Sequence, residues 1–169
     1  MRTAGLDIAT CTGMAYVNDL GEIIGKTASL PKEKRSYRKL QSIAKDVART
    51  LDVWRPELVA IEGYGHPGRS GLHSLIVLVE MGTLIRIALL DLGIPWVELP
   101  STVLKKWTTG KGNADKAQMA VSVKSRWGFE SPSHDIVDAV ALAQVAQMGL
   151  PDILALPGAF LGPSESVSA

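Results

Sequence analysis

The chain has 169 residues, 46% of them hydrophobic and 21% charged, a composition that suits a folded globular domain and excludes a disordered chain. Lys and Arg number 18 against 17 Asp and Glu, for a formal net charge of +1, so bulk charge does not demand a nucleic-acid or membrane partner. The single cysteine, Cys11, excludes an internal disulfide framework and a cysteine-only metal site. A free thiol suits a reducing compartment, and the first residues lack the apolar stretch of an export signal, so we expect the cytoplasm.

The first part of the chain predicts three short strands followed by a helix. Residues 2–9, 12–18 and 22–29 are β-type runs bounded by turn residues, and an antiparallel meander is their simplest pairing. From Pro31 to Trp54, apolar residues repeat at three- and four-residue spacing. This spacing predicts an amphipathic helix, whose opposite face is basic.

A strand–helix–strand unit comes next. The apolar run 58–62 ends in Glu62 and leads into a glycine-rich loop, and a long apolar helix connects it to a strand at residues 95–99. This order favours parallel pairing of the two strands.

The connecting segment, residues 72–94, is apolar enough to raise the question of a membrane. Three charges interrupt it at short intervals: Glu80, Arg86 and Asp91. They leave no uncharged span of about 20 residues, so we predict a buried or interface helix. Its apolar residues exceed the stripe that covers one sheet face. We therefore predict a homodimer, with Ile76 and Leu84 as outward apolar positions, although burial between the sheet and the C-terminal helices is the alternative.

The C-terminal third predicts three helices. Ser101 can cap a short helix, residues 108–113 (TTGKGN) predict a flexible turn, and residues 115–127 and 134–148 predict two further helices.

The predicted architecture is α/β, with a mixed five-stranded sheet of three antiparallel N-terminal strands and two parallel strands, flanked by helices. We expect one domain over residues 1–150. The tail, residues 151–169, is rich in Pro and Ser and is expected to be loosely ordered.

Four carboxylates stand at positions that suit a ligand site. Asp7 lies in an apolar strand, where an unpaired carboxylate is costly, although solvent exposure or hydrogen bonds from the loop at residues 10–12 would also satisfy it. Glu62 ends an apolar strand, where α/β sheets place ligands; a plain loop carboxylate is the alternative. Asp135 and Asp138 share one face of an apolar helix, although the helix dipole also favours acids in a first turn.

Taken together, these four acids can converge on one edge of the sheet. Four hard oxygen ligands without matching His or Cys suit Mg²⁺ or Mn²⁺ over zinc. Paired metals about 3.5–4 Å apart are a recurring solution for phosphodiester hydrolysis. The set therefore predicts a metal-dependent phosphodiesterase site.

Basic residues gather in two parts of the sequence. Between Lys26 and Arg49 there are eight basic residues and two acids, and between Lys105 and Arg126 there are six and one. A solvated helix face is the alternative for the first group. The second group surrounds a glycine turn that could approach a phosphate backbone, and two aromatic residues could stack on bases, although core packing is the commoner role of a Trp. The candidate DNA-binding residues are Tyr64, Lys105, Lys106, Trp107, Lys111 and Lys116.

From about residue 3 to 148 the sequence resembles the RuvC family of Holliday-junction endonucleases, within the RNase H-like superfamily. GLDIATCTGMAYV is similar to the family's first-strand motif, with Asp7 as its catalytic acid, and PELVAIEGY to the second acidic motif, with Glu62. LKKWTTGKGNADKAQM is similar to the basic stretch that contacts the junction. HDIVDAVALA resembles the final two-acid helix, which carries Asp135 and Asp138.

The resemblance implies an RNase H-like fold and a crossover junction endodeoxyribonuclease. It implies a homodimer that nicks two strands of like polarity in four-way junctions and leaves 5′-phosphate ends. Mg²⁺, with Mn²⁺ able to substitute and two ions per site, would be held by the four acids, with Lys105 or Lys116 at the scissile phosphate. No nucleotide cofactor or membrane is implied. Departures at Ala9-Thr10 and in the loop after Glu62 suggest a phage-type member, acting in the host cytoplasm, that accepts other branched DNA.

Two other functions stay open at this point. One is a non-catalytic module that binds branched DNA with the same fold. The other is a fragment of an actin-like ATPase, because Asp7, Thr10, Thr12 and Gly13 also resemble the phosphate loop of those enzymes, although they need two such domains. Metal-dependent junction cleavage and nucleotide binding separate the three.

Overall fold

The computed structural model describes residues 1–9, 11–29, 37–63 and 71–162. Within these ranges, six strands form one sheet in the order β3-β2-β1-β4-β5-β6. The first three strands pair antiparallel, β1, β4 and β5 pair parallel, and β6 is antiparallel to β5. The strands are β1 (Thr3–Asp7), β2 (Cys11–Val17), β3 (Ile23–Ser29), β4 (Leu58–Glu62), β5 (Trp96–Leu99) and β6 (Phe160–Leu161).

The mixed α/β sheet is confirmed, but the prediction of five strands is one too few. The sixth strand, β6, pairs with β5 through Val97 and Leu161, and Gly162 N–H donates to Trp96 O at 2.9 Å. Helix α6 (Leu150–Leu154) precedes it. Residues 151–162 therefore contain regular structure where loose order was expected, whereas residues 163–169 lie outside the described part of the chain.

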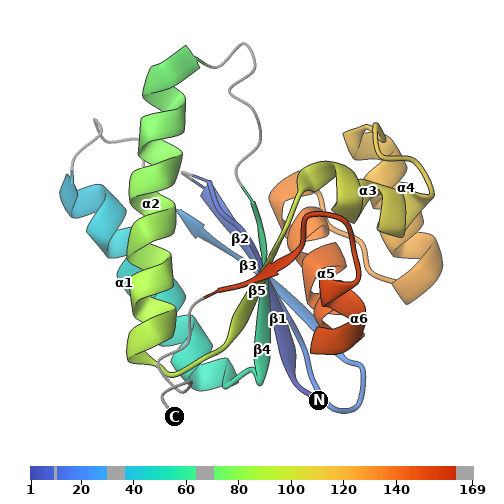
Figure 1. Ribbon diagram of the computed structural model, residues 1–169, viewed down its shortest axis with the longest axis horizontal. Coiled ribbons are helices and arrows are strands. Elements are labelled where there is room, and N and C mark those ends of the chain that lie inside the picture. Colours follow the sequence, from blue (N-terminus) through green and yellow to red (C-terminus); the bar gives the residue numbers. More distant parts are fainter. Residues whose placement is uncertain (10, 30–36, 64–70, 163–169) are drawn as a thin grey trace.

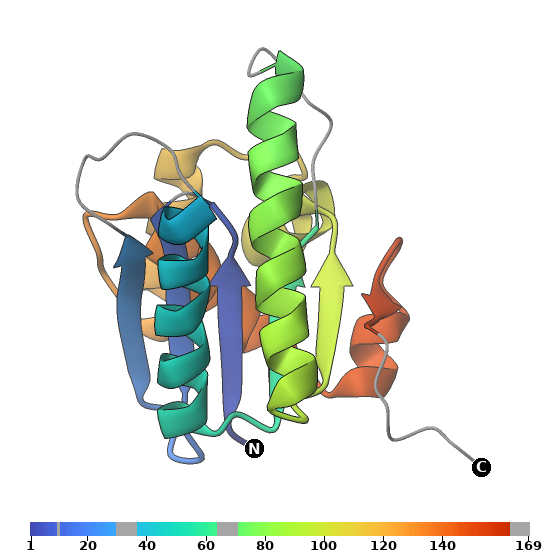
Figure 2. The ribbon, with the colours of Figure 1, turned by 90° about the vertical axis from the view of Figure 1, so that its left-hand side faces the viewer.

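Helices cover both faces of the sheet. Helices α1 (Tyr37–Trp54) and α2 (Gly71–Asp91) lie side by side on one face (Figure 2). The opposite face carries α3 (Ser101–Thr109), α4 (Lys116–Trp127) and α5 (His134–Ala146) (Figure 1). Successive side chains of a strand point to opposite faces of the sheet, so the strands contribute side chains to both helix layers. Leu6 packs toward α1 and α2, whereas Ala60 packs toward α5.

Helix α2 packs against the sheet with one side and exposes apolar residues on the other. The side that packs on the sheet is formed by Val77, Met81, Ile85 and Leu89. The exposed apolar residues are Leu72, Ile76, Val79 and Ile87. Ile76 is thus outward as predicted. Leu84 is partly buried and packs against the core, so the prediction that it faces outward was wrong. Because α2 and α5 lie on opposite faces, α2 is not covered by α5. Among the described helices, none is long and apolar enough to cross a bilayer.

Helix α5 lies directly on the sheet because glycines remove the side chains beneath it. A Cβ on Gly5 would stand 2.0 Å from the carbonyl oxygen of Ala139, and one on Gly13 would stand 2.0 Å from that of Asp135. Any larger residue would push the helix outward. This close packing brings the first turn of α5 onto β2, next to the end of β1.

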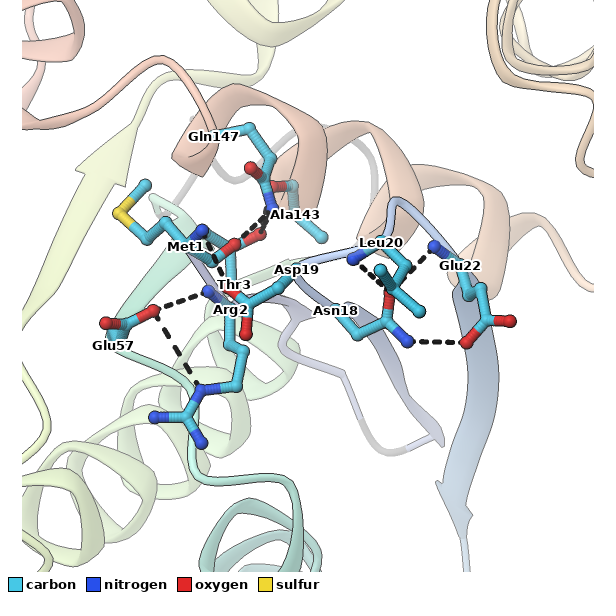
Figure 3. Close-up of polar contacts among 10 residues, drawn as sticks. All are labelled: Met1, Arg2, Thr3, Asn18, Asp19, Leu20, Glu22, Glu57, Ala143 and Gln147. Atoms are coloured by element: carbon cyan, nitrogen blue, oxygen red, sulfur yellow. Dashed lines mark hydrogen bonds and ion pairs between the residues drawn. The ribbon is translucent and has the colours of Figure 1, made fainter.

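The far end of α5 is tied to the start of β1. The Thr3 hydroxyl donates to Ala143 O at 2.8 Å, and the Gln147 amide donates to Thr3 Oγ1 at 2.9 Å and to Met1 O at 2.8 Å (Figure 3). These bonds fix how far α5 is shifted along β1. Together with the close contacts at Gly5 and Gly13, these bonds determine which α5 residues face the end of β1.

The helix ends differ from the sequence prediction at two places. Pro100, not Ser101, is the N-cap of α3, and it makes no side-chain capping bond. The predicted flexible turn at residues 108–113 is shorter than expected, because 108 and 109 belong to α3 and Gly110 ends it with a φ of 82°. Asp115 caps α4 in a capping box with Gln118.

Candidate active site

Two of the predicted acids end neighbouring parallel strands. Asp7 is the last residue of β1 and Glu62 the last residue of β4. Gly5, two residues before Asp7, lies under α5, and Ala60, two residues before Glu62, belongs to the core layer on the same side. Strand alternation therefore directs both carboxylates toward α5.

The other two acids come from the beginning of α5. Ser133 caps this helix by accepting from Ile136 N–H at 3.4 Å, which places Asp135 in the first turn and Asp138 one turn later. The backbone of Asp135 lies against Gly13, which is paired with Asp7 across the β1–β2 ladder. The sheet edge and the helix start thus meet at one place.

The pKa values show that the four carboxylates affect one another. Burial, together with the charges of Glu62, Asp138 and Asp135, raises the pKa of Asp7 to about 8, with Lys116 opposing the rise. Burial, together with the charge of Glu62, raises the pKa of Asp138 to about 6, with Lys105 and Lys116 opposing the rise. Negative charge at this site is therefore only partly compensated by the protein's own cations.

Glu62 has more local support than Asp7. Burial raises its pKa, whereas a hydrogen bond from the Ser101 hydroxyl and the charge of Lys105 act in the opposite direction. Ser101 and Lys105 both belong to α3. One helix therefore supplies a hydroxyl and an ammonium group to the same carboxylate.

Two of the predicted basic residues reach the acids, and the others lie farther out. Lys105 is half-buried and Lys116 exposed, and both act electrostatically on the carboxylates. Lys106 and Lys111 are exposed on the same corner, formed by α3 and the turn into α4. Tyr64 lies outside the described residues.

Trp107 takes part in packing between α3 and α4. Its ring stacks on that of Trp127, with centroids 5.7 Å apart and an interplanar angle of 20°. The Arg126 guanidinium carbon lies 4.5 Å from the Trp107 ring centroid, and Arg126 Nη1 donates to Trp107 O at 2.7 Å. This placement favours the packing role over base stacking.

The carboxylates are gathered but do not yet form a metal-binding group. In the part of the chain that the structure describes, no three Asp, Glu, His or Cys side chains already stand in such an arrangement. The donor set nevertheless fits a hard cation, since all four groups are carboxylates and the pKa values of Asp7 and Asp138 are raised by mutual repulsion as well as burial. The side chains would have to reorient to share an ion.

Two residues near the acids were not predicted as part of the site. Hydrogen bonding with Ser101 lowers the pKa of Glu62, whereas burial and the neighbouring Asp135 raise the pKa of the Cys11 thiol, with Ser29 opposing. Their only signal in the sequence is position: Cys11 begins the strand after Asp7, and Ser101 follows the strand beside Glu62. Nothing in their residue types indicates these contacts.

A family model described as "Crossover junction endodeoxyribonuclease RuvC" matches residues 5–146. This span contains the four carboxylates and both lysines that reach them. The chain belongs to the RuvC family. The predicted family resemblance is thereby confirmed, and the match ends before α6 and β6 begin.

Individual RuvC proteins agree with this assignment. The crossover junction endodeoxyribonuclease RuvC of Synechococcus sp. (strain WH7803) is 31% identical over 107 residues, which cover 62% of this chain and 68% of that protein. RuvC of Prochlorococcus marinus (strain MIT 9313) is 26% identical over 155 residues, covering 85% and 96%. The sequence identity is moderate in both alignments, but each alignment covers most of the relative's length.

Solved structures support the fold. Thermus thermophilus RuvC superposes with a TM-score of 0.71 at 24% identity, covering 88% of this chain and 97% of the other. The same protein in complex with Holliday junction substrate gives 0.70 at 22% identity, covering 85% and 90%. The yeast mitochondrial Holliday junction resolvase Ydc2 gives 0.55 at 11%, covering 83% and 75%. These matches support the RNase H-like architecture that the sequence predicted.

The raised pKa values predict how pH affects stability in the absence of metal. Between the ordinary value of 3.8 and the folded value of about 8, the native protein holds a proton on Asp7 that the unfolded chain has lost. The native state then binds more protons, so the free energy of unfolding falls as pH rises through this range. In chelator, the unfolding temperature should decrease from about pH 5 to about pH 8, and Asp7→Asn should flatten this decrease. An equal decrease in both proteins would contradict the assignment.

Proposed function

We propose that this protein is a metal-dependent, structure-selective DNA endonuclease that resolves four-way Holliday junctions and accepts other branched DNA. One observation carries the proposal: four mutually repelling carboxylates and two lysines meet at one sheet edge, in a chain whose family model is that of a crossover junction endodeoxyribonuclease. We also expect it to act in the cytoplasm, because its free thiol, Cys11, suits a reducing compartment.

Asp7, Glu62, Asp135 and Asp138 are the candidate ligands for Mg²⁺, with Mn²⁺ able to substitute and two ions per site. Bound divalent ions would neutralise charge on the attacking and leaving oxygens of an in-line phosphoryl displacement. The reaction breaks the bond between phosphorus and the 3′-oxygen while water adds to phosphorus. It leaves a 3′-hydroxyl and a 5′-phosphate, which a ligase can reseal.

Lys116 and Lys105 are the candidates to hold the scissile phosphate. Both act on the carboxylates from the corner formed by α3 and α4, and an ammonium group there would stabilise the charge that develops on the phosphate oxygens. Lys116 is the more exposed of the two. It is the candidate catalytic lysine.

The α3–α4 corner also serves as the proposed backbone-binding surface. Neutralising Lys105, Lys111 and Lys116 together should weaken junction binding and reduce the slope of log affinity against log salt by about one unit per lost phosphate contact. Binding would be measured by fluorescence anisotropy between about 50 and 200 mM salt. Lys124→Gln is the matched control, because Lys124 lies at the far end of α4 and pairs with Glu130. An unchanged slope would mean that DNA binds elsewhere.

The proposal includes a homodimer. Resolving a two-fold junction by paired nicks needs two active sites related by two-fold symmetry. The exposed apolar residues of α2, including Ile76 and Val79, form a stripe that a second copy would cover. This supports α2 as the dimer interface.

Cleavage of synthetic DNA tests the proposed function. The protein would be incubated with a labelled four-way junction, a three-way fork and a linear duplex, each with Mg²⁺ or with chelator. We expect nicking of the junction in Mg²⁺, weaker nicking of the fork, and no cleavage of the duplex or in chelator. Binding without cleavage under all metal conditions would favour a non-catalytic DNA-binding module instead.

A further inference from the structure

Ser101 is a helix residue whose side chain is free of a capping role. The N-cap of α3 is Pro100, with extended backbone angles of −60° and 141° and no side-chain capping bond. Ser101 follows as the first residue of the helix itself. Its hydroxyl is therefore available to a neighbouring group.

Backbone pairing brings that hydroxyl to Glu62. In the parallel ladder of β4 and β5, Glu62 is paired with Leu99, and Gly63 N–H donates to Leu99 O at 2.8 Å. Ser101 follows two residues after Leu99 as the first residue of α3, so the strand register places it beside Glu62, and hydrogen bonding with its hydroxyl lowers the pKa of that carboxylate. The end of one strand thus meets the helix that leaves the next.

Helix α3 supports Glu62 in two further ways. Lys105 lies one helical turn after Ser101, on the same side of the helix, and its charge acts on Glu62. The positive end of the helix dipole lies at Ser101. A hydroxyl, a cation and a helix end thus converge on one carboxylate, whereas Asp7 is assisted by Lys116 from a different helix.

We propose that Ser101 is a positioning residue, whose hydroxyl holds the Glu62 carboxylate in the orientation in which it ligates the metal ion. The inference rests on the proposed function. A carboxylate oxygen that accepts the hydroxyl leaves the second oxygen for the ion, and hydrogen bonds of this kind orient metal ligands in proteins. Ser101 acts through Glu62 and needs no contact with DNA.

Metal binding to the DNA-free protein tests this role. Mn²⁺ would be titrated by calorimetry into the wild type, Ser101→Ala, Ser101→Thr and Thr102→Ala. Thr102 is the matched control, because it is exposed in the same helical turn. We expect Ser101→Ala to weaken Mn²⁺ binding about tenfold, Ser101→Thr to restore it by keeping the hydroxyl, and Thr102→Ala to match the wild type.

Two further readouts separate positioning from folding. The unfolding temperature of Ser101→Ala in chelator should match that of the wild type, and its junction cleavage should recover at saturating Mn²⁺. Equal Mn²⁺ binding by Ser101→Ala and the wild type would overturn this inference alone, as would failure of Ser101→Thr to restore binding. No Mn²⁺ binding by the wild type would overturn the proposed function and this inference with it.

Discussion

Asp7→Asn is expected to abolish junction cleavage while leaving junction affinity within a few-fold of the wild type. Asp7 is the acid on which the charges of the other three converge, so replacing it removes the central candidate metal ligand. A loss of about 4 kcal/mol in transition-state stabilisation corresponds to about a thousandfold in rate. Binding should survive, because the substitution also removes a negative charge near the DNA.

The control for this variant is Asp152→Asn, which neutralises an exposed acid on α6. Single-turnover cleavage in Mg²⁺ and junction binding in chelator would be measured for both proteins. The control should cleave like the wild type. Near-wild-type cleavage by Asp7→Asn would show that the assigned site is wrong.

Ile76→Glu is expected to convert a dimer into a folded monomer that cannot make paired cuts. Ile76 lies on the exposed apolar stripe of α2. A carboxylate at this position stays in solvent in the monomer, but the proposed interface would bury it without a partner, which disfavours the dimer. The monomer itself should keep its stability, because the side chain is exposed in a single copy. Sedimentation velocity without DNA and analysis of nicks on both strands of a junction check the two effects.

Leu20→Glu is the matched control for the dimer prediction, since Leu20 is an exposed apolar residue in the turn between β2 and β3, away from both α2 and the acids. It should remain a dimer and cut in pairs. A monomeric wild type at micromolar concentration, or a dimeric Ile76→Glu protein, would contradict the proposed interface.

Three of the four acids could be predicted because each interrupts a strong apolar pattern. Asp7 and Glu62 end runs of buried strand residues, and Asp138 is the only polar residue between Ile136 and Ala143 of α5. A buried charge in such a context needs a reason. The edge at which the carboxylates meet follows from strand order, since parallel neighbours end at the same side of a sheet.

What the sequence could not predict depends on tertiary contacts. Strand β6 has two residues, too few to show alternation. Leu84 is as apolar as Ile76, and only the packing of α2 decides which of them is exposed. Ser101 has a residue type that suits an N-cap, and its contact with Glu62 appears only when β5 pairs with β4.

The most direct test of the central claim is to map both nicks in a single four-way junction of fixed sequence, labelled on all strands, and then to add DNA ligase. We expect Mg²⁺-dependent nicks at symmetric positions in two strands of like polarity, with 5′-phosphate ends that the ligase reseals. Unpaired or asymmetric nicks, ends that cannot be ligated, or equal cleavage in chelator would contradict it.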